Sequence, residues 1–245
     1  MKCLILAAGY ATRLYPLTEN FPKPLLEVGG KTILDWLIED IDTTGEVDEY
    51  VVISNGKFAH HFESWAKKSD KNITVVNDKT MSNETRLGAV LDIKFAIDTL
   101  KLSGDMLVIA GDNLLDFSLA PFISYARAKK ASAIMRYYEA DEKKLLKCGV
   151  VTIDSTDRVL QMTEKSPTPA THWCTPPFYY YTAEDAAKIG EGIKAGCNTD
   201  APGSYIAWLA SSSPVYAMEM PGSRYDIGNL ESYEKVKSEY KGITK

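Results

Sequence analysis

The sequence is poor in cysteine. Its four cysteines lie far apart and show no paired spacing, which indicates neither a zinc site nor a disulfide framework. Isolated thiols of this kind are typical of a reducing compartment, so we expect a cytoplasmic protein. The four are Cys3, Cys148, Cys174 and Cys197.

Long hydrophobic runs are also absent. The apolar stretch from Leu4 to Ala8 is too short for the hydrophobic region of a signal peptide. No other apolar run approaches the length needed to span a membrane. We therefore expect a protein that is neither exported nor embedded in a membrane.

The sequence has no excess of positive charge. Its formal net charge is -5, from 28 Lys and Arg against 33 Asp and Glu, which argues against a dedicated nucleic-acid-binding protein because such a protein needs a basic face. Flexible linkers, internal repeats and low-complexity tracts are missing as well. With 45% hydrophobic residues, the chain of 245 residues has the composition of a globular protein, and one continuous domain over 1–245 is expected.

What the sequence does contain is an alternation of short β-rich runs with longer helical patterns. This alternation is typical of stacked βαβ units and predicts an α/β fold with a mainly parallel sheet. Apolar residues recur at helical spacing, which predicts helices packed on that sheet. The first half, 1–130, is therefore expected to be Rossmann-like. Its strands are predicted near 2–7, 49–54, 72–76 and 105–110, and its helices over 33–41 and 87–100.

The second half, 131–245, is richer in β-like runs. We expect it to complete the sheet and to close the acceptor side of a substrate cleft. Its strands are predicted at 132–138, 149–154, 158–162 and 178–181, and its helices near 184–193 and 229–240.

The most informative segment is the N-terminal strand with the loop that follows it, KCLILAAGYATRLYPLT over 2–18, closed by a Pro-Lys-Pro at 22–24. Small residues after a strand let backbone N–H groups converge on an anion, and Arg13 and Lys23 can neutralise charge on either side of it. The flanking prolines fix the backbone of Lys23. An ordinary strand–turn–helix corner explains Gly9 but not the two cations, so the segment predicts a polyphosphate-binding loop.

This segment resembles the signature of the sugar nucleotidyltransferases, the nucleotide-sugar pyrophosphorylases: Leu-Ala-(Ala or Gly)-Gly-x-Gly-(Thr or Ser)-Arg-Leu-x-Pro-Leu-Thr, then Pro-Lys-Pro. Ala11 stands where the family usually has its second glycine. The resemblance implies a Rossmann-like, mainly parallel mixed sheet flanked by helices, the glycosyltransferase-A-like nucleotidyltransferase architecture. It also implies catalytic roles for Arg13 and Lys23 on the phosphates. The implied nucleotide-binding loop is Leu6, Ala7, Ala8, Gly9, Tyr10, Ala11 and Thr12.

A second informative segment is an apolar strand that ends in Gly111 and Asp112. Ligands of open α/β sheets collect at the carboxyl ends of strands, and Mg²⁺ is commonly held by one or two carboxylates together with substrate phosphates. Asp226, in Tyr-Asp-Ile-Gly-Asn, resembles the second metal segment of the family. The resemblance thus implies Mg²⁺ held by Asp112 and Asp226, with Asp112 also on the acceptor side. Taken singly, Asp112 as a turn cap and Asp226 beside a helix dipole are alternative explanations.

A polar stretch over 77–89 precedes the second predicted helix, where the family reads the nucleobase. Asn83 carries a donor and an acceptor on one short amide and is a candidate reader, while Gly88 permits a close backbone approach. An N-cap role for Asn83 and a packing role for Gly88 remain open. The base-reading variants with glutamine or Gly-Thr-Ala are missing, so the base stays undetermined.

Two segments of the second half resemble the acceptor side of the family, and a third departs from it. Cys-Gly-Val-Val at 148–151 resembles Tyr-Gly-Val, which implies that Gly149 contacts the sugar through its backbone. Glu-Lys-Ser-Pro at 164–167 resembles Glu-Lys-Pro, which implies that Glu164 accepts hydrogen bonds from sugar hydroxyls and Lys165 contacts the acceptor phosphate. Tyr179, in a tyrosine-rich run that replaces the family's Ala-Gly-x-Tyr, is a further acceptor candidate or a core residue.

The chemistry implied by these segments needs no general base. A phosphomonoester has its second pKa near ~6, so its oxygen is already a nucleophile at neutral pH. The three histidines therefore need no catalytic role: His60 and His61 lie on a predicted surface helix, and His172 lies in a loop. We expect direct transfer of a nucleoside monophosphate from a nucleoside triphosphate to a sugar 1-phosphate, with Mg²⁺ as the cofactor.

Other functions remain open. A CTP:phosphocholine cytidylyltransferase keeps the chemistry and changes the acceptor, whose cationic head would need an aromatic cage from the run between Trp173 and Tyr181. A non-catalytic regulatory homologue is a second alternative. A dehydrogenase is disfavoured, because no acidic ribose ligand follows the glycine loop at a strand end. The sequence leaves base, acceptor and oligomeric state open, a homo-oligomer included.

Overall fold

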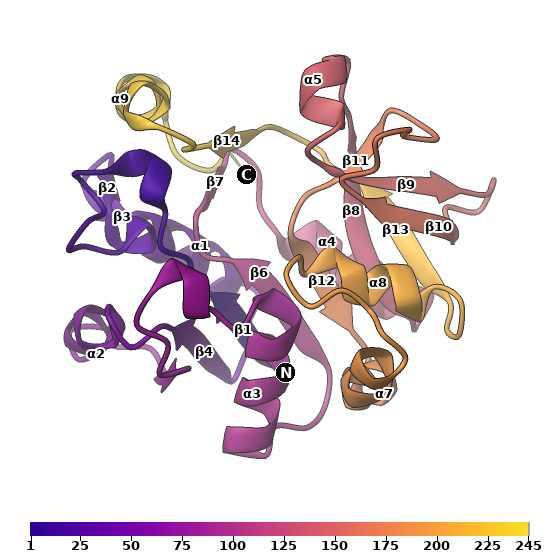
Figure 1. Cartoon of the computed structure of the whole chain (residues 1–245), viewed down its shortest axis with the longest axis horizontal. Coiled ribbons are helices and arrows are strands. Elements are labelled where there is room, and N and C mark those ends of the chain that lie inside the picture. Colours follow the sequence, from indigo (N-terminus) through magenta and orange to yellow (C-terminus); the bar gives the residue numbers. More distant parts are fainter. Residues whose placement is uncertain (245) are drawn as a thin grey trace. The chain divides into compact units, whose positions relative to one another are not determined.

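The computed structural model describes residues 1–244 and divides them into two compact units (Figure 1). The first unit contains Met1–Arg86, Ala110–Ala120 and the chain from Pro221 onward. The second contains Leu87–Ile109 and Pro121–Met220. The C-terminal segment thus belongs to the first unit, and Leu87–Ile109 belongs to the second. The expectation of one continuous domain stays a prediction.

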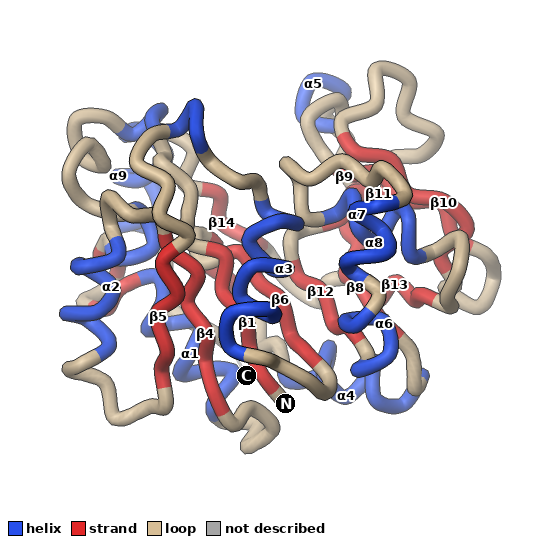
Figure 2. The backbone as a smooth tube through the Cα atoms, turned by 60° about the horizontal axis from the view of Figure 1, so that its bottom comes forward, coloured by secondary structure: helices blue, strands red, loops and turns tan. Residues whose placement is uncertain are grey.

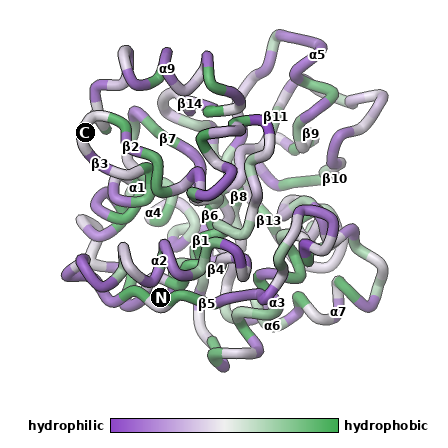
Figure 3. Tube along the Cα trace, turned by 60° about the vertical axis from the view of Figure 1, so that its left-hand side comes forward, coloured by the Kyte–Doolittle hydropathy of each residue, from purple (hydrophilic) through white to green (hydrophobic). Residues whose placement is uncertain are grey.

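A parallel sheet forms the centre of the first unit. Strand β1 (Lys2–Leu6) pairs with β4 (Glu49–Ser54), and β4 pairs with β5 (Ile73–Asn77), as Figure 2 shows. The middle of β1 and nearly all of β4 are buried, in keeping with the apolar runs of strands that are covered on both faces. In Figure 3 the colouring is hydrophobic along much of β1 and β4, whereas α5 (Glu142–Leu145) is hydrophilic. The strands predicted near 2–7, 49–54 and 72–76 are confirmed.

Helices cover this sheet. Helix α1 (Ile33–Asp42) starts at a capping box in which Thr32 and Asp35 satisfy each other's backbone N–H groups. Helix α2 (Ala59–Ala66) packs on β4 and β5 and carries His60 and His61, as predicted. Helix α9 (Leu230–Glu239), yellow in Figure 1, follows β14 (Arg224–Asp226) and confirms the helix predicted near 229–240.

Short elements complete the first unit. Strand β2 (Glu27–Val28) pairs with β3 (Lys31–Thr32), and β7 (Asn113–Leu115) pairs antiparallel with β14. Three 3₁₀ turns lie at Thr12–Leu14, Lys23–Leu25 and Asn83–Thr85. Strands β7 and β14 were not predicted, because three residues are too few to show an alternating pattern.

The second unit is built on a mixed sheet in the order β10-β9-β11-β8-β12-β6, with β13 pairing parallel to β8. Strand β12 runs antiparallel to both of its neighbours. The strands predicted at 105–110, 132–138, 149–154, 158–162 and 178–181 are confirmed, whereas β11 and β13 were not predicted. The bounds are β6 (Met106–Ala110), β8 (Ser132–Tyr138), β9 (Gly149–Ile153), β10 (Val159–Glu164), β11 (Trp173–Thr175), β12 (Phe178–Tyr181) and β13 (Val215–Glu219).

Helices flank this mixed sheet as well, so the α/β class is confirmed. The helix expected over 87–100 begins later, because Gly88 at its N-terminus has a φ of 97° that no helix interior adopts. The helix expected near 184–193 is two helices that meet at Lys188. The bounds are α3 (Ala89–Leu100), α4 (Ala120–Lys129), α6 (Ala183–Ala187), α7 (Ile189–Lys194) and α8 (Gly203–Leu209), of which α4 and α8 were not predicted.

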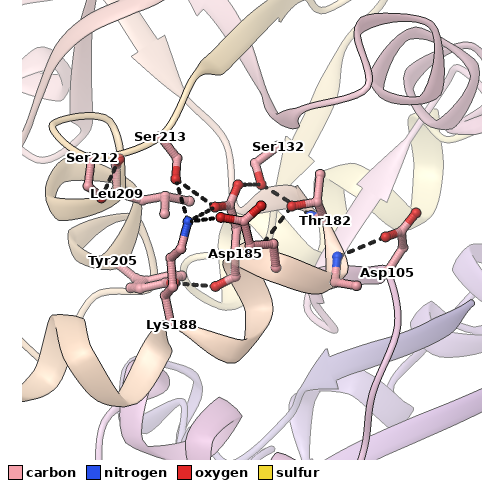
Figure 4. A network of polar contacts seen from close by, with 11 residues as sticks. Asp105, Ser132, Thr182, Asp185, Lys188, Tyr205, Leu209, Ser212 and Ser213 are labelled. Carbon is pink, nitrogen blue, oxygen red and sulfur yellow. Dashed lines mark hydrogen bonds and ion pairs between the residues drawn. The ribbon is translucent and has the colours of Figure 1, made fainter.

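A buried polar network ties α6 to its surroundings (Figure 4). The carboxylate of Asp185, 4% exposed, accepts hydrogen bonds from Ser132 at 2.6 Å and from Ser213 at 2.7 Å. Lys188 donates to the same carboxylate at 3.3 Å. One side chain therefore joins α6, β8 and the segment before β13, and its charge is compensated where water cannot reach it.

Replacing Asp185 by Ala should lower the free energy of unfolding by about 3–5 kcal/mol, because it leaves buried hydroxyl groups without their acceptor and breaks a buried ion pair. Glu184→Gln is the matched control: Glu184 also pairs with Lys188 but its side chain is 80% exposed, so a loss of about 1 kcal/mol at most is expected. Urea unfolding of both variants measures the difference. Equal, small losses would show that the network contributes little.

Across residues 1–244, every helix falls short of the length or the apolar character that spanning a lipid bilayer requires.

Candidate active site

A pocket of the first unit lies at the loop after β1. Three segments that are far apart in the sequence contribute to it: the loop with its Pro-Lys-Pro, the turn at Asp112, and the residues after β14. These are the segments that the sequence motifs had singled out. The lining residues are Leu6, Ala7, Gly9, Ala11, Arg13, Leu14, Lys23, Pro24, Asp112, Ile227 and Gly228.

The loop after β1 presents backbone donors. Ala7 N–H makes the last sheet contact, donating to the carbonyl of Ile53 at 2.9 Å. Beyond it, the backbone N–H groups of residues 8–11 donate to no acceptor in the part of the chain that the structure describes. Consecutive N–H groups without acceptors are the kind of site that binds an anion.

Ala11 adopts the left-handed conformation, with a φ of 46° and a ψ of 41°. This region favours glycine, which is the residue the family usually has at this position. The alanine therefore adopts a glycine-like backbone conformation at some conformational cost.

Lys23 is a buried cation beside a carboxylate. It begins the 3₁₀ turn Lys23–Leu25, and only 6% of it is exposed. Its Nζ donates to Oδ2 of Asp112 at 2.8 Å. Arg13, in the 3₁₀ turn Thr12–Leu14, is exposed and lines the same pocket.

Gly111 sets the position of Asp112. Its N–H donates to the carbonyl of Leu6 at 2.9 Å, and a Cβ on it would lie 2.9 Å from side-chain carbons of both Ile5 and Leu34. Only glycine fits there without a shift of neighbouring atoms, and Asp112 consequently follows beside the carboxyl end of β1. Asp112 is thus held at the strand end where ligands of such sheets collect.

The charge of Asp112 is stabilised in place. Desolvation alone would raise the pKa of this carboxyl group, but the charge and hydrogen bond of Lys23, together with the charge of Arg224, bring the pKa below its ordinary value. Asp112 is therefore ionised at neutral pH, as a ligand of a hard cation must be.

Asp226 comes from the other end of the chain and directly precedes Ile227 and Gly228, which line this pocket. It lies on β14 opposite Asn113, the residue after Asp112, and it is exposed. An ideal Cβ on Gly228 would lie 3.6 Å from Oδ2 of Asp226 and 3.9 Å from Nη1 of Arg13, so the two charged groups flank one glycine. The structure thus brings the predicted Arg13, Lys23, Asp112 and Asp226 into one region.

Arg224 is a site residue that sequence reasoning missed. Its Nη1 donates to Oδ1 of Asn113 at 2.8 Å, and Asn113 in turn donates to Oδ1 of Asp112 at 3.1 Å. The signal was present, because Arg224 lies two residues before Asp226 and alternate residues of a strand share a face. Arg224 could be recognised from this spacing only once the strand β14 was known.

Asn83 and Gly88 lie in different units. Ser82, not Asn83, caps the 3₁₀ turn Asn83–Thr85, and no hydrogen bond of the Asn83 side chain is found within residues 1–244. Its amide is thus available to a ligand. Gly88, in the second unit, has a φ of 97°, and a Cβ on it would lie 2.6 Å from the carbonyl oxygen of Thr199. That close approach is to the chain's own backbone, which accounts for the glycine.

Glu164 is a desolvated carboxylate in the second unit. An ideal Cβ would lie 2.9 Å from Oε1 of Glu164 if built on Gly149, and 2.0 Å if built on Gly203. Two glycines therefore leave room for the carboxylate, which has no hydrogen-bond partner in the described chain. Burial raises the pKa of Glu164 above its ordinary value, and the nearby charge of Lys165 only partly offsets this. Lys165 itself is exposed.

The tyrosine-rich run is a core element. Tyr179 and Tyr181 are 2% and 1% exposed, and their rings lie parallel at 6.1 Å. Trp173 has the guanidinium of Arg136 over its ring at 4.9 Å. The sequence left open whether Tyr179 is an acceptor residue or a core residue. These contacts are those of core packing. An aromatic cage open to a cationic ligand is not formed by these three side chains.

The raised pKa of Glu164 predicts a pH-dependent stability difference. A carboxyl group whose folded-state pKa is raised contributes stability that is complete below its unfolded value of 4.5 and is lost as the pH rises through the folded value. Glu164→Gln should therefore be more stable than the wild type near pH 7, and the difference should shrink toward pH 4. Urea unfolding across this range measures it, and a difference independent of pH would contradict the raised pKa of Glu164.

Comparisons with known proteins show the family to which the chain is similar. The model of the nucleotidyl transferase family matches residues 2–242. The bifunctional protein GlmU of Methanococcus aeolicus is 33% identical over 183 residues, which cover 74% of this chain and 40% of that protein. UTP–glucose-1-phosphate uridylyltransferase AglF of Haloferax volcanii is 26% identical over 240 residues, which cover 96% of this chain and 95% of that protein.

The chain spans less than two thirds of some of these relatives, 40% of GlmU and 63% of a further relative from Sulfolobus acidocaldarius. Among solved structures, UDP-glucose pyrophosphorylase complexed with UDP-glucose matches with a TM-score of 0.82 over 98% of this chain and 97% of that one. At 20% identity this likeness shows the fold alone, and it confirms the predicted nucleotidyltransferase architecture, glycosyltransferase-A-like with a mixed sheet flanked by helices.

Proposed function

Because this chain belongs to the nucleotidyl transferase family, we propose that it transfers a nucleoside monophosphate from a nucleoside triphosphate to a sugar 1-phosphate, giving an NDP-sugar and pyrophosphate. One observation carries the proposal. A loop of backbone donors, the cations Arg13 and Lys23 and the carboxylate of Asp112 line one pocket of the first unit, and Asp226 lies beside its residue Gly228. AglF, a relative of nearly the same length, is named for uridylyl transfer to glucose 1-phosphate and supports this acceptor class.

The triphosphate binds at the loop of residues 6–12. The N–H groups of residues 8–11 donate to its oxygens, while Arg13 and Lys23 neutralise the charge that accumulates on the departing pyrophosphate. Asn83, whose amide has no partner in the described chain, reads the edge of the base. Gly88 is left out of this proposal, because its close approach is to the chain's own backbone.

The reaction is a direct displacement at the α-phosphorus. The oxygen of the acceptor phosphate attacks, the bond to the β-phosphate oxygen breaks, and pyrophosphate leaves with the electron pair. The attacking oxygen is already ionised at neutral pH, so no residue has to remove a proton. Repulsion between the two anions is the obstacle, and fixed positive charges are the means by which the protein lowers it.

Asp112 and Asp226 fit a Mg²⁺ ion. Both offer hard oxygen ligands, Asp112 is held ionised, and the pairing of β7 with β14 aligns the segments that carry them. Among residues 1–244 no group of three or more His, Cys, Asp and Glu side chains surrounds a common point, so the other ligands would be phosphates and water. When bound, Mg²⁺ supplies positive charge to the phosphate oxygens of both substrates.

The acceptor sugar binds through the second unit. Glu164 is a desolvated carboxylate without a partner, and accepting hydrogen bonds from sugar hydroxyls would replace the solvation that it has lost. Gly149 offers its backbone beside this carboxylate, and Lys165 adds a positive charge for the acceptor phosphate. Tyr179 is left out of this set because its ring is buried. The wide spacing of the four cysteines in the sequence supports a cytoplasmic location.

Pyrophosphate release from a panel of nucleoside triphosphates tests the proposal, with sugar 1-phosphates or phosphocholine as acceptors and with Mg²⁺ present. We expect release with at least one sugar 1-phosphate and none with phosphocholine, because the buried tyrosines form no cage. Release with phosphocholine alone would move the function to cytidylyl transfer. A protein that binds nucleotide but turns over no acceptor of the panel would be a regulatory homologue.

A further inference from the structure

Asn55 contacts the loop of residues 6–12 from the interior of the first unit. It follows β4 directly and is 0% exposed. Its Nδ2 donates to the carbonyl of Ala8 at 2.9 Å, and its Oδ1 accepts from the N–H of Phe58 at 2.9 Å. The orientation of the amide is determined by its partners, since a carbonyl only accepts and a backbone N–H only donates. One buried amide therefore joins the loop to the start of α2.

Thr18 makes the same kind of contact further along the loop. It is 0% exposed, and its Oγ1 donates to the carbonyl of Ala11 at 2.8 Å. Ala11 is the residue in the left-handed conformation, so Thr18 holds the one peptide whose backbone shape an alanine does not favour. The backbone N–H of Leu14 donates to the same carbonyl at 2.9 Å.

The residues between these two contacts alternate between the pocket and the interior. Gly9 and Ala11 line the pocket. Tyr10 is 4% exposed, and its ring lies 6.0 Å from that of Phe58. Its hydroxyl group is 3.4 Å from that of Thr80. The loop is thus fixed at Ala8, Tyr10 and Ala11 by groups outside the pocket.

We propose that Asn55 and Thr18 are positioning residues that hold the loop in its nucleotide-binding shape before the nucleotide arrives. They bind the carbonyl oxygens of Ala8 and Ala11 and keep these negative ends of the peptide dipoles directed away from the phosphates. The N–H groups of residues 8–11 remain available as donors. This inference rests on the proposed function, and it adds residues that touch no substrate.

A positioning role can be distinguished from ordinary packing because it affects the binding of one substrate and not of the other. A loop that is loosened must be ordered when the triphosphate binds, so the cost appears in nucleotide binding. The acceptor residues of the second unit are untouched, and the cations that stabilise the leaving pyrophosphate are still present. The KM for the nucleotide should therefore change, with little change in the KM for the acceptor.

Thr18→Val and Thr18→Ser form a matched pair. Valine has nearly the shape of threonine but cannot donate, whereas serine keeps the hydroxyl group and loses only a methyl group. We expect Thr18→Val to raise the KM for the nucleoside triphosphate about fivefold or more, and Thr18→Ser to stay within about twofold of the wild type. Asn55→Asp is the second variant, because it can still accept from Phe58 but offers Ala8 no donor. It should weaken nucleotide binding at least as much.

All variants are compared at a temperature where circular dichroism shows them folded, with the dissociation constant for the nucleotide measured without acceptor. Wild-type affinity in both Thr18→Val and Asn55→Asp would overturn the positioning role alone. Equal increases in the KM for the nucleotide and the KM for the acceptor, with Thr18→Ser no better than Thr18→Val, would show that these contacts contribute only to packing. A wild type that binds no nucleoside triphosphate would overturn the proposed function, and this inference with it.

Discussion

Asp226→Asn should lower turnover by about a hundredfold or more while the free energy of unfolding stays close to that of the wild type. Asparagine keeps the shape of the side chain but removes the charge that a hard cation requires. Asp226 is exposed and forms no ion pair within the described chain, so its replacement disturbs no internal contact. The lower turnover would then result from a defect in the reaction and not from a less stable fold.

Asp112→Asn should lose turnover to the same extent, and in addition some stability. Lys23, 6% exposed, would then face a neutral amide in place of the carboxylate at 2.8 Å. Comparison of the two variants separates the effect of losing a proposed metal ligand from the effect of losing the ion pair between Lys23 and Asp112. Glu231→Gln, in the first turn of α9, removes one negative charge near Asp226 without touching the pocket and serves as the control. Near-normal pyrophosphate release with Mg²⁺ from Asp226→Asn would contradict the assignment.

Lys23→Met should reduce kcat/KM for the nucleoside triphosphate by about a hundredfold to a thousandfold. Methionine fills the buried space of the stem but brings no charge, so the loss reports the cation itself. The KM for the acceptor should change much less, because the residues proposed for it lie in the second unit. Lys235→Met, on the exposed face of α9, is the control for the loss of one positive charge.

Lys23→Arg adds a test of geometry. A guanidinium group is larger and planar, and the site of Lys23 is almost fully enclosed. Arginine should therefore restore little of the lost activity. Full recovery with arginine would show that the site needs a positive charge but not the shape of lysine. Unchanged kinetics in Lys23→Met would show that this lysine only neutralises Asp112.

The charged residues of the site could be predicted because they come with local patterns. Arg13 and Lys23 belong to one motif after a strand, and Asp112 ends an apolar run, so each is visible within about ten residues of sequence. Asp226 was found only by its resemblance to a family segment. The long strands and the amphipathic helices were predictable for the same reason, since their periodicity is repeated over several residues.

What the sequence could not show depends on contacts between distant segments. The pairing of β7 with β14 places Asp226 opposite Asn113, the residue after Asp112, yet each strand has only three residues. Arg224 became visible as a site residue only once that pairing was known. Asn55 and Thr18 act through single hydrogen bonds to loop carbonyls, which leave no periodic trace. Tyr179 was named as an acceptor candidate although its ring is buried. A strand buried on both faces shows no alternation of polar and apolar residues, so the burial of Tyr179 could not be predicted from the sequence.

The central claim is that Asp112 and Asp226 together hold the divalent cation on which nucleotide transfer depends. Binding of Mn²⁺, followed by its electron paramagnetic resonance signal in the presence of a non-hydrolysable nucleoside triphosphate, tests it most directly. The wild type should bind the ion together with the nucleotide, and Asp112→Asn and Asp226→Asn should each bind it far more weakly. Wild-type affinity for Mn²⁺ in both variants would contradict the claim.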